Sequence, residues 1–182
     1  MHSVELLPDP ATERAVEDVW RRLEESGRPS LATHRHPTNR PHLTLATADA
    51  LPPETGDRVR CALAVLPLPL CLDGTVRFAG RKPVLAWAVR ADDALLRLHE
   101  TVWRALRDAP GGGRPNPLHD PARWTPHITL GRGRDTVPPG PEPDPDEDPF
   151  RGTTTPSGVL TGRWTGARHY DSVTRTTEPI GP

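Results

Sequence analysis

Aromatic residues, cysteine and lysine are scarce in this 182-residue chain. Aromatic residues make up 4% of it, so five tryptophans are the largest pieces available to a modest core. The two cysteines, Cys61 and Cys71, are too few for a disulfide scaffold and form no zinc-binding spacing. Lys82 is the only lysine, and the net charge of −1 calls for neither a nucleic acid nor a membrane as a partner.

The chain also lacks an apolar run long enough to cross a membrane and a basic, apolar leader at its start. We therefore expect a cytoplasmic protein with reduced thiols and no membrane contact. Its length suits one domain, so residues 1–182 are taken as a single, monomeric unit of two lobes. Residues 136–149 are rich in proline and acidic residues and predict a flexible loop.

What the chain does have is one five-residue motif written twice. Pro41–Leu45 and Pro126–Leu130 both read Pro-His-aliphatic-Thr-Leu, with their histidines 85 positions apart (127 − 42). The alternation of polar and aliphatic residues predicts a strand for each copy. In a strand the His and the Thr share one face and the aliphatic residues share the other. Two such strands brought together make a polar site with paired imidazoles.

The rest of the chain predicts an alternation of strands and helices. Asp9 and Pro10 suit the start of a helix, which Gly27 ends, and Asp92 suits the start of a second strongly amphipathic helix. Both motif strands follow a strand, a helix and a loop, which indicates two similar lobes from a duplicated unit. The predicted strands are Ser3–Leu7, Pro41–Thr47, Leu68–Phe78, Val84–Arg90, Thr125–Arg132, Val159–Ala167 and Tyr170–Thr177, and the predicted helices begin near Pro10, Pro52 and Asp92.

Paired histidines with neighbouring threonines fit phosphoester chemistry. An imidazole titrates near neutral pH, so one histidine can remove a proton while the other supplies one on the opposite side of a phosphorus atom. The hydroxyls of Thr44 and Thr129 can then hydrogen-bond the non-bridging oxygens. This arrangement needs no metal and no other cofactor, and no serine or thiol nucleophile lies near the motifs.

Two His-x-Thr motifs, one in each half of a chain of this size, resemble the two-histidine (2H) phosphoesterase superfamily. The branch that the chain resembles is the bacterial 2′-5′ RNA ligase and RNA 2′,3′-cyclic phosphodiesterase group. The resemblance implies a bilobal α+β fold with pseudo-two-fold symmetry, antiparallel sheets lining a central groove and helices outside. It also implies that His42 is the general acid and His127 the general base when a 2′,3′-cyclic phosphate is opened, with the roles exchanged in ligation.

Two residues beside the second motif are further candidates for substrate contact. Arg132 lies where relatives often carry a basic residue near the phosphate, or it is a solvated residue at a strand end. Trp124 either stacks a base at the rim of the groove or packs in the core. Arg40, and the group Arg77, Arg81 and Lys82, are candidate phosphate contacts that also suit a solvated surface.

These observations leave open three kinds of function. The first is a phosphoesterase acting on RNA ends, short oligonucleotides or cyclic nucleotides. The second is a non-catalytic nucleotide- or RNA-binding module that uses the same groove. The third is a histidine metal site, for which no third ligand is evident. The remaining histidines that we considered are interpreted as surface or packing residues: His34, His36, His99, His119 and His169.

Overall fold

The structure is a computed structural model that describes residues 1–111, 113–133 and 158–181, so the predicted loop at 136–149 lies outside the described residues. The motif strands are β2 (Leu43–Ala48) and β5 (His127–Arg132). The other strands are β1 (His2–Pro8), β3 (Leu68–Phe78), β4 (Val84–Val89), β6 (Val159–Asp171) and β7 (Thr176–Pro179), and the helices are α1 (Pro10–Glu25), α2 (Pro53–Leu63) and α3 (Asp93–Arg107), with short 3-10 turns η1 (Leu31–Thr33) and η2 (Pro117–His119).

The two long helices begin at the predicted acidic caps. The Asp9 carboxylate accepts hydrogen bonds from the backbone N–H groups of Ala11 and Thr12, both at 3.0 Å. The Asp92 carboxylate accepts one from Leu95 at 2.8 Å. Each cap satisfies donors that the first helical turn leaves unpaired. Gly27, at φ 71°, ends α1 in a backbone conformation that glycine adopts without strain.

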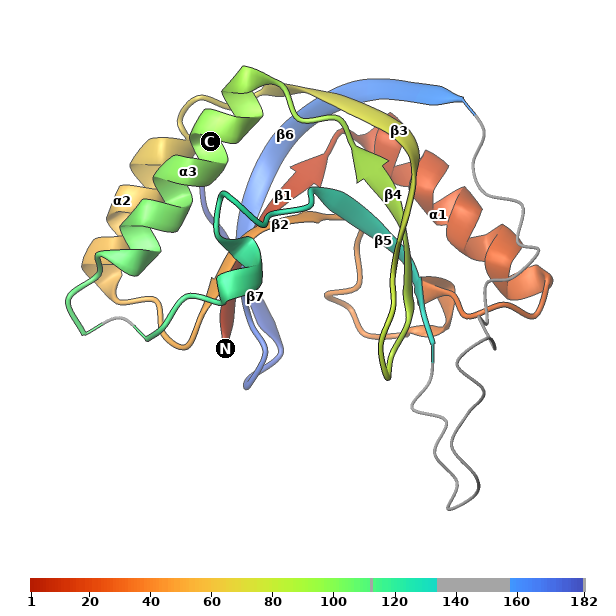
Figure 1. The fold of residues 1–182 in the computed structure, drawn as a ribbon, viewed down its shortest axis with the longest axis horizontal. Coiled ribbons are helices and arrows are strands. Elements are labelled where there is room, and N and C mark those ends of the chain that lie inside the picture. Colours follow the sequence, from red (N-terminus) through yellow and green to blue (C-terminus); the bar gives the residue numbers. More distant parts are fainter. Residues whose placement is uncertain (112, 134–157, 182) are drawn as a thin grey trace, which may run out of the picture.

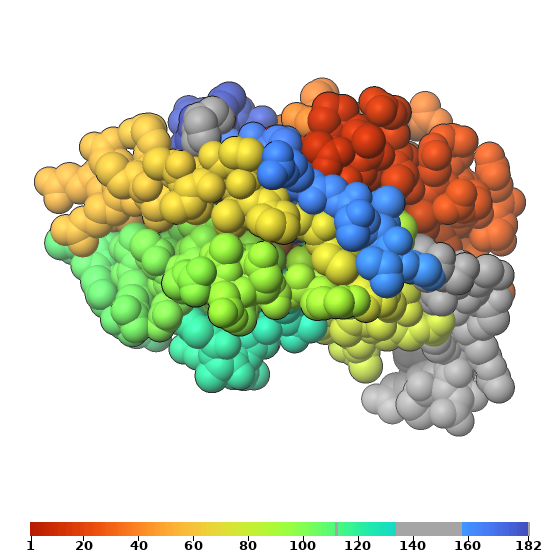
Figure 2. All heavy atoms as spheres, turned by 90° about the horizontal axis from the view of Figure 1, so that it is seen from above, coloured from red at the N-terminus to blue at the C-terminus, as the bar shows by residue number. Residues whose placement is uncertain are grey.

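Within the described residues the strands are antiparallel and form one seven-stranded sheet in the order β1-β2-β5-β4-β3-β6-β7. β6 closes this sheet on itself because its first half pairs with β3 and its second half pairs with β1. Figure 1 shows the resulting arch, with β6 and β3 passing over its top. Seen from above, β6 crosses the middle of the molecule beside β3, with α1 on one side and α2 on the other (Figure 2).

The helices cover the aliphatic face of the motif strands. α1 packs on β5 and β6, α3 packs on β2, and α2 packs on α3. Leu43, Leu45, Ile128 and Leu130 are at most 1% exposed and belong to the hydrophobic core. The predicted α+β fold of antiparallel strands with helices outside is therefore confirmed, and the imidazole and hydroxyl side chains extend from the face that these helices do not cover.

The end of the chain differs from the prediction. β6 runs on through His169 to Asp171, where two separate strands had been expected to leave His169 in a loop. The turn into β7 follows Asp171, whose carboxylate accepts hydrogen bonds from Val173 at 2.8 Å and Thr174 at 3.0 Å. With this local side-chain cap at the turn, β6 ends four residues later (171 − 167) than the hydrophobic pattern suggests.

Candidate active site

Leu43 of β2 lies directly opposite Ile128 of β5, so the middle residues of the two motifs form a cross-strand pair. In an antiparallel register the partner numbers keep the same sum, here 171. The same register therefore places His42 beside Thr129, and Thr44 beside His127. His42 and His127 then occupy diagonal positions of this register, which are roughly 7–8 Å apart. The two histidines and two threonines of the motifs thus share one face of the sheet.

Both imidazoles are held by the same backbone contact. Nδ1 of His42 donates to the carbonyl of Arg40, and Nδ1 of His127 donates to the carbonyl of Thr125, each at 2.7 Å. A carbonyl only accepts, so Nδ1 carries the proton in each ring and Nε2 is left for chemistry. Nε2 is therefore the ring nitrogen that each imidazole can present to a ligand.

Two tryptophans make a second matched pair of contacts. The indole N–H of Trp20 in α1 donates to the carbonyl of Thr129 at 3.0 Å. The indole N–H of Trp124 donates to the carbonyl of Thr44 at 3.1 Å. Each motif threonine is thus anchored by an indole from outside its own strand. One face of the Trp124 ring is covered by His99, with ring centroids 3.7 Å apart and planes 2° from parallel, and stacking of a base on its other face stays a prediction.

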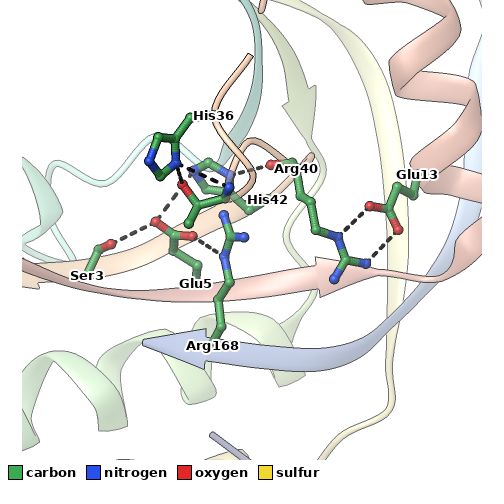
Figure 3. A network of polar contacts seen from close by, with 8 residues as sticks. Ser3, Glu5, Glu13, His36, Arg40, His42 and Arg168 are labelled. Atoms are coloured by element: carbon green, nitrogen blue, oxygen red, sulfur yellow. Dashed lines mark hydrogen bonds and ion pairs between the residues drawn. The ribbon is translucent and has the colours of Figure 1, made fainter. Parts of the chain in front are cut away.

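A buried carboxylate distinguishes the two histidines. Glu5 of β1 is 3% exposed and lies opposite Thr44 on one side and Arg168 on the other. Its carboxylate accepts hydrogen bonds from Ser3 Oγ and Arg168 Nε, both at 2.7 Å. Its Oε1 atom lies 3.7 Å from Nε2 of His42. Figure 3 shows Glu5 between Arg168 and His42, so the buried carboxylate contacts both a guanidinium and one of the two motif imidazoles.

His127 has the opposite surroundings. Its ring lies against Phe78 of β3, with centroids 4.7 Å apart. Burial lowers the pKa of His127 below its ordinary value, the hydrogen bond to Thr125 opposes this, and the positive charges of Arg132 and His42 lower it further. His127 is therefore held neutral, as a general base requires, while a carboxylate faces His42.

The amino-acid sequence of the chain also matches a known protein family. The model of the 2′-5′ RNA ligase superfamily matches residues 8–142, about three quarters of the chain and both motifs. The chain belongs to this superfamily. No curated protein sequence matches the chain.

Several solved structures share the fold of this superfamily member. A crystal structure described as a phosphoesterase is 20% identical, with a TM-score of 0.56, over 98% of this chain and 92% of that one. E. coli LigT in complex with NADP⁺ is 19% identical, with a TM-score of 0.52, over 98% and 91%. Usb1 from Kluyveromyces marxianus is 14% identical, with a TM-score of 0.55, over 98% and 96%. At these identities the likeness concerns the fold.

One histidine near the paired imidazoles was predicted from the sequence only as a surface or packing residue. His119 in η2 has Nδ1 3.2 Å from Oγ1 of Thr47, and its carbonyl accepts a hydrogen bond from His99 at 3.0 Å. Burial, with smaller effects of His99 and His127, lowers the pKa of His119 to about 4. A lone histidine in a proline-rich loop carries no periodic signal, so only the folded chain reveals that it lies near His127.

The predicted cations have different surroundings. Arg132 is exposed at the end of β5, and its charge acts on His127. Arg40 forms two hydrogen bonds with Glu13, at 2.6 and 2.7 Å (Figure 3), so its guanidinium is already engaged by a carboxylate. Arg77 lies in β3, and Arg81 and Lys82 lie in the turn between β3 and β4.

The described part of the chain contains no group of three or more His, Cys, Asp or Glu side chains arranged to hold a metal ion. None of its helices has both the length and the apolar character that a membrane span requires. Cys61 and Cys71 carry free thiols.

Proposed function

We propose that this protein is a metal-independent phosphoesterase that hydrolyses a 2′,3′-cyclic phosphate, on an RNA end or a nucleotide, or acts on a 2′-5′ phosphodiester bond. The observation that carries the proposal is the register of Leu43 with Ile128. It brings the His42 and His127 imidazoles, to which we assign the catalytic roles, and the Thr44 and Thr129 hydroxyls onto one sheet face. Both imidazoles keep Nε2 available because Nδ1 is bonded to the backbone.

The unequal surroundings of the two histidines give each a role in hydrolysis. Neutral His127 takes a proton from water at Nε2 while the water oxygen bonds to phosphorus. The bond from phosphorus to one ribose oxygen breaks, and that oxygen receives a proton from Nε2 of His42, which faces the Glu5 carboxylate. Thr44 and Thr129 donate hydrogen bonds to the non-bridging phosphate oxygens, and ligation uses the same steps in reverse.

The ligands of related structures support a nucleotide substrate. E. coli LigT has been solved with NADP⁺, with ATP and with 3′-AMP, and Kluyveromyces marxianus Usb1 with uridine monophosphate. We extend nucleotide binding from these proteins to this chain as part of the proposal. A cyclic phosphate at the end of a short RNA or on a single nucleotide presents the same reacting group.

The direct test is hydrolysis of nucleoside 2′,3′-cyclic phosphates by three variants. His42→Ala and His127→Ala should each lower kcat by roughly 10²–10⁴-fold, the usual contribution of a general acid or base. His34→Ala, a change at an exposed histidine outside this cluster, should leave kcat unchanged. Activity should also persist in a chelator, because the two imidazoles move all the protons.

Equal rates for His42→Ala, His127→Ala and the unaltered protein would overturn the proposal. Nucleotide binding without any product over long incubation would favour the alternative of a non-catalytic binding module. A panel of 2′,3′-cyclic nucleotides, RNA with a cyclic end and 2′-5′ oligonucleotides then identifies the preferred phosphoester from the phosphate position that the product keeps.

A further inference from the structure

A cavity of about 270 Å³ lies where β2 ends, next to the turn η2. Both apolar and polar side chains line it, and they include one acidic and one basic side chain. The cavity is lined by Met1, Thr47, Ala48, Asp49, Arg114, Pro115, Asn116 and Pro117. The phosphoester chemistry described above uses none of these residues.

The walls of the cavity are fixed by backbone contacts between the end of β2 and the segment before η2. Ala48 and Pro115 form an antiparallel bridge, and the N–H of Asn116 donates to the carbonyl of Thr47 at 2.9 Å. Gly113 approaches so closely that an added Cβ atom would lie 2.1 Å from Cβ of Asp49. The segment that carries Arg114 is therefore held against β2 where only glycine fits.

Thr47 joins this cavity to the histidine site. It lies opposite Ser3 in the sheet, and Ser3 shares its face of β1 with Glu5, so Thr47 belongs to the same face as Thr44. Its hydroxyl contacts His119, whose pKa is lowered in part by His127. A substrate held between His42 and His127 therefore has the cavity as its neighbour, beyond His119.

The residues that line the cavity suit one chemical class of ligand better than they suit a simple anion. Pro115 and Pro117 offer apolar surface for a flat ring. Around them, Asp49 offers acceptors and Arg114 offers donors, and both side chains are exposed and free of hydrogen bonds and ion pairs to the described residues. The amide oxygen of Asn116 accepts from Leu118 at 3.0 Å, which leaves its NH₂ group to donate. A nucleobase combines an apolar face with an edge of donors and acceptors.

We propose that this cavity is a subsite for the base of the nucleotide that adjoins the reacting phosphate, with Arg114 and Asp49 binding the edge of the base. This inference rests on the proposed function, because it assumes that the histidine site holds a nucleotide phosphate. It makes an RNA end of at least two nucleotides, rather than a single cyclic nucleotide, the preferred substrate.

Calorimetric binding tests the subsite without requiring turnover. The ligands are uridine 3′-phosphate, which fills the histidine site alone, and the dinucleotide UpUp, which also reaches the cavity. The unaltered protein should bind UpUp more tightly than uridine 3′-phosphate. Arg114→Ala should weaken UpUp binding by roughly tenfold or more, the cost of losing a hydrogen bond to a charged group, and leave uridine 3′-phosphate binding unchanged. Asp49→Asn should act in the same direction.

The matched control is Arg97→Ala, which removes an exposed arginine on α3 away from the cavity and should weaken neither ligand. Equal binding of the two ligands by the unaltered protein, or an Arg114→Ala loss of the same size for both, would overturn the subsite. Undetectable UpUp binding would overturn it as well. If the subsite fails in one of these ways, hydrolysis of a mononucleoside cyclic phosphate would still support the proposed phosphoesterase. If UpUp binds selectively but no substrate is hydrolysed, only the proposed phosphoesterase is contradicted.

Discussion

Leu43 and Ile128 face each other across β2 and β5, and the two motifs are arranged symmetrically about this pair. The symmetry extends to the imidazole contacts with backbone carbonyls and to the indole contacts with the motif threonines. The symmetry is broken by the strands that flank the motif strands. Glu5 of β1 lies opposite Thr44, whereas Ala86 of β4 lies opposite Thr129. Two equivalent histidines thereby acquire different electrostatic surroundings.

The first prediction concerns the pH profile of hydrolysis. The general base must be neutral, so kcat/KM falls on the acid side as His127 becomes protonated. The Arg132 cation disfavours that protonation and lowers the pKa of His127. Arg132→Gln should therefore raise this pKa and move the acid limb of the kcat/KM profile to higher pH.

The profile is measured at low ionic strength, where a surface charge acts over its longest range. Added salt should move the limb of the unaltered protein in the same direction, and Arg97→Gln should not move it. Loss of a phosphate contact alone would scale the profile down without shifting it. A limb that stays in place, or moves to lower pH, contradicts the electrostatic role of Arg132.

The repeated motif was sufficient to predict the two strands and their aliphatic core face, and the acidic caps Asp9 and Asp92 were sufficient to predict where two helices begin. Those features depend on local periodicity and on caps next to each helix. Pairing between the distant strands β1, β2 and β6 brings Glu5, Arg168 and His42 together. An acidic residue inside the short apolar strand Ser3–Leu7 is a weak signal, because its sequence reveals neither its burial nor its partner.

A second limit of the sequence concerns the tryptophans. Trp124 was recognised as a residue near the motif, but its contact with Thr44 joins positions 80 residues apart. Trp20 was expected only as one of five tryptophans available to the core, yet its indole reaches Thr129, 109 positions away. A hydrophobic pattern identifies which residues are buried but not which buried polar atoms meet.

The second prediction follows from these indole contacts. Trp20→Phe leaves the carbonyl of Thr129 without its donor and should cost about 1–3 kcal/mol of unfolding free energy, besides the loss of ring volume. It should also lower kcat, because the threonine is no longer anchored. Denaturant unfolding and hydrolysis of a cyclic nucleotide measure the two effects.

Trp164→Phe is the matched control for that prediction. Trp164 is 0% exposed, and its indole N–H has no acceptor among the described residues. The change thus removes ring volume and an unpaired donor, so it should destabilise less than Trp20→Phe and leave kcat unaltered. Equal effects of the two substitutions on stability and rate would show that ring volume alone matters.

The third prediction concerns the buried ion pair. Side chains of Arg168 and Glu5 are 7% and 4% exposed, with Nε and Oε2 2.7 Å apart. Arg168→Gln leaves the Glu5 carboxylate buried without its cation and should cost about 3–5 kcal/mol. The double variant Glu5→Gln/Arg168→Gln should recover part of this loss, because no unpaired charge remains.

An exposed pair sets the scale for comparison. Glu100 and Arg104 are 46% and 61% exposed, with Oε1 and Nη2 2.6 Å apart, and Glu100→Gln should cost less than about 1 kcal/mol. The four proteins of the Glu5/Arg168 cycle and this control are compared by urea unfolding at neutral pH. Strictly additive single changes would contradict a coupled buried pair.

The last prediction concerns stability in acid. The pKa of His119 falls from 6.5 to about 4 on folding, so the unfolded chain binds a proton at a pH where the folded chain does not. Its share of stability is complete above pH 6.5 and is lost as the pH falls towards 4. The difference of 2.5 units (6.5 − 4) corresponds to at most about 3 kcal/mol. His119→Gln should flatten the dependence of unfolding free energy on pH across this range, whereas His34→Gln should not. Parallel curves for His119→Gln and the unaltered protein would mean that His119 is solvated, and that the contact with Thr47 does not shield it.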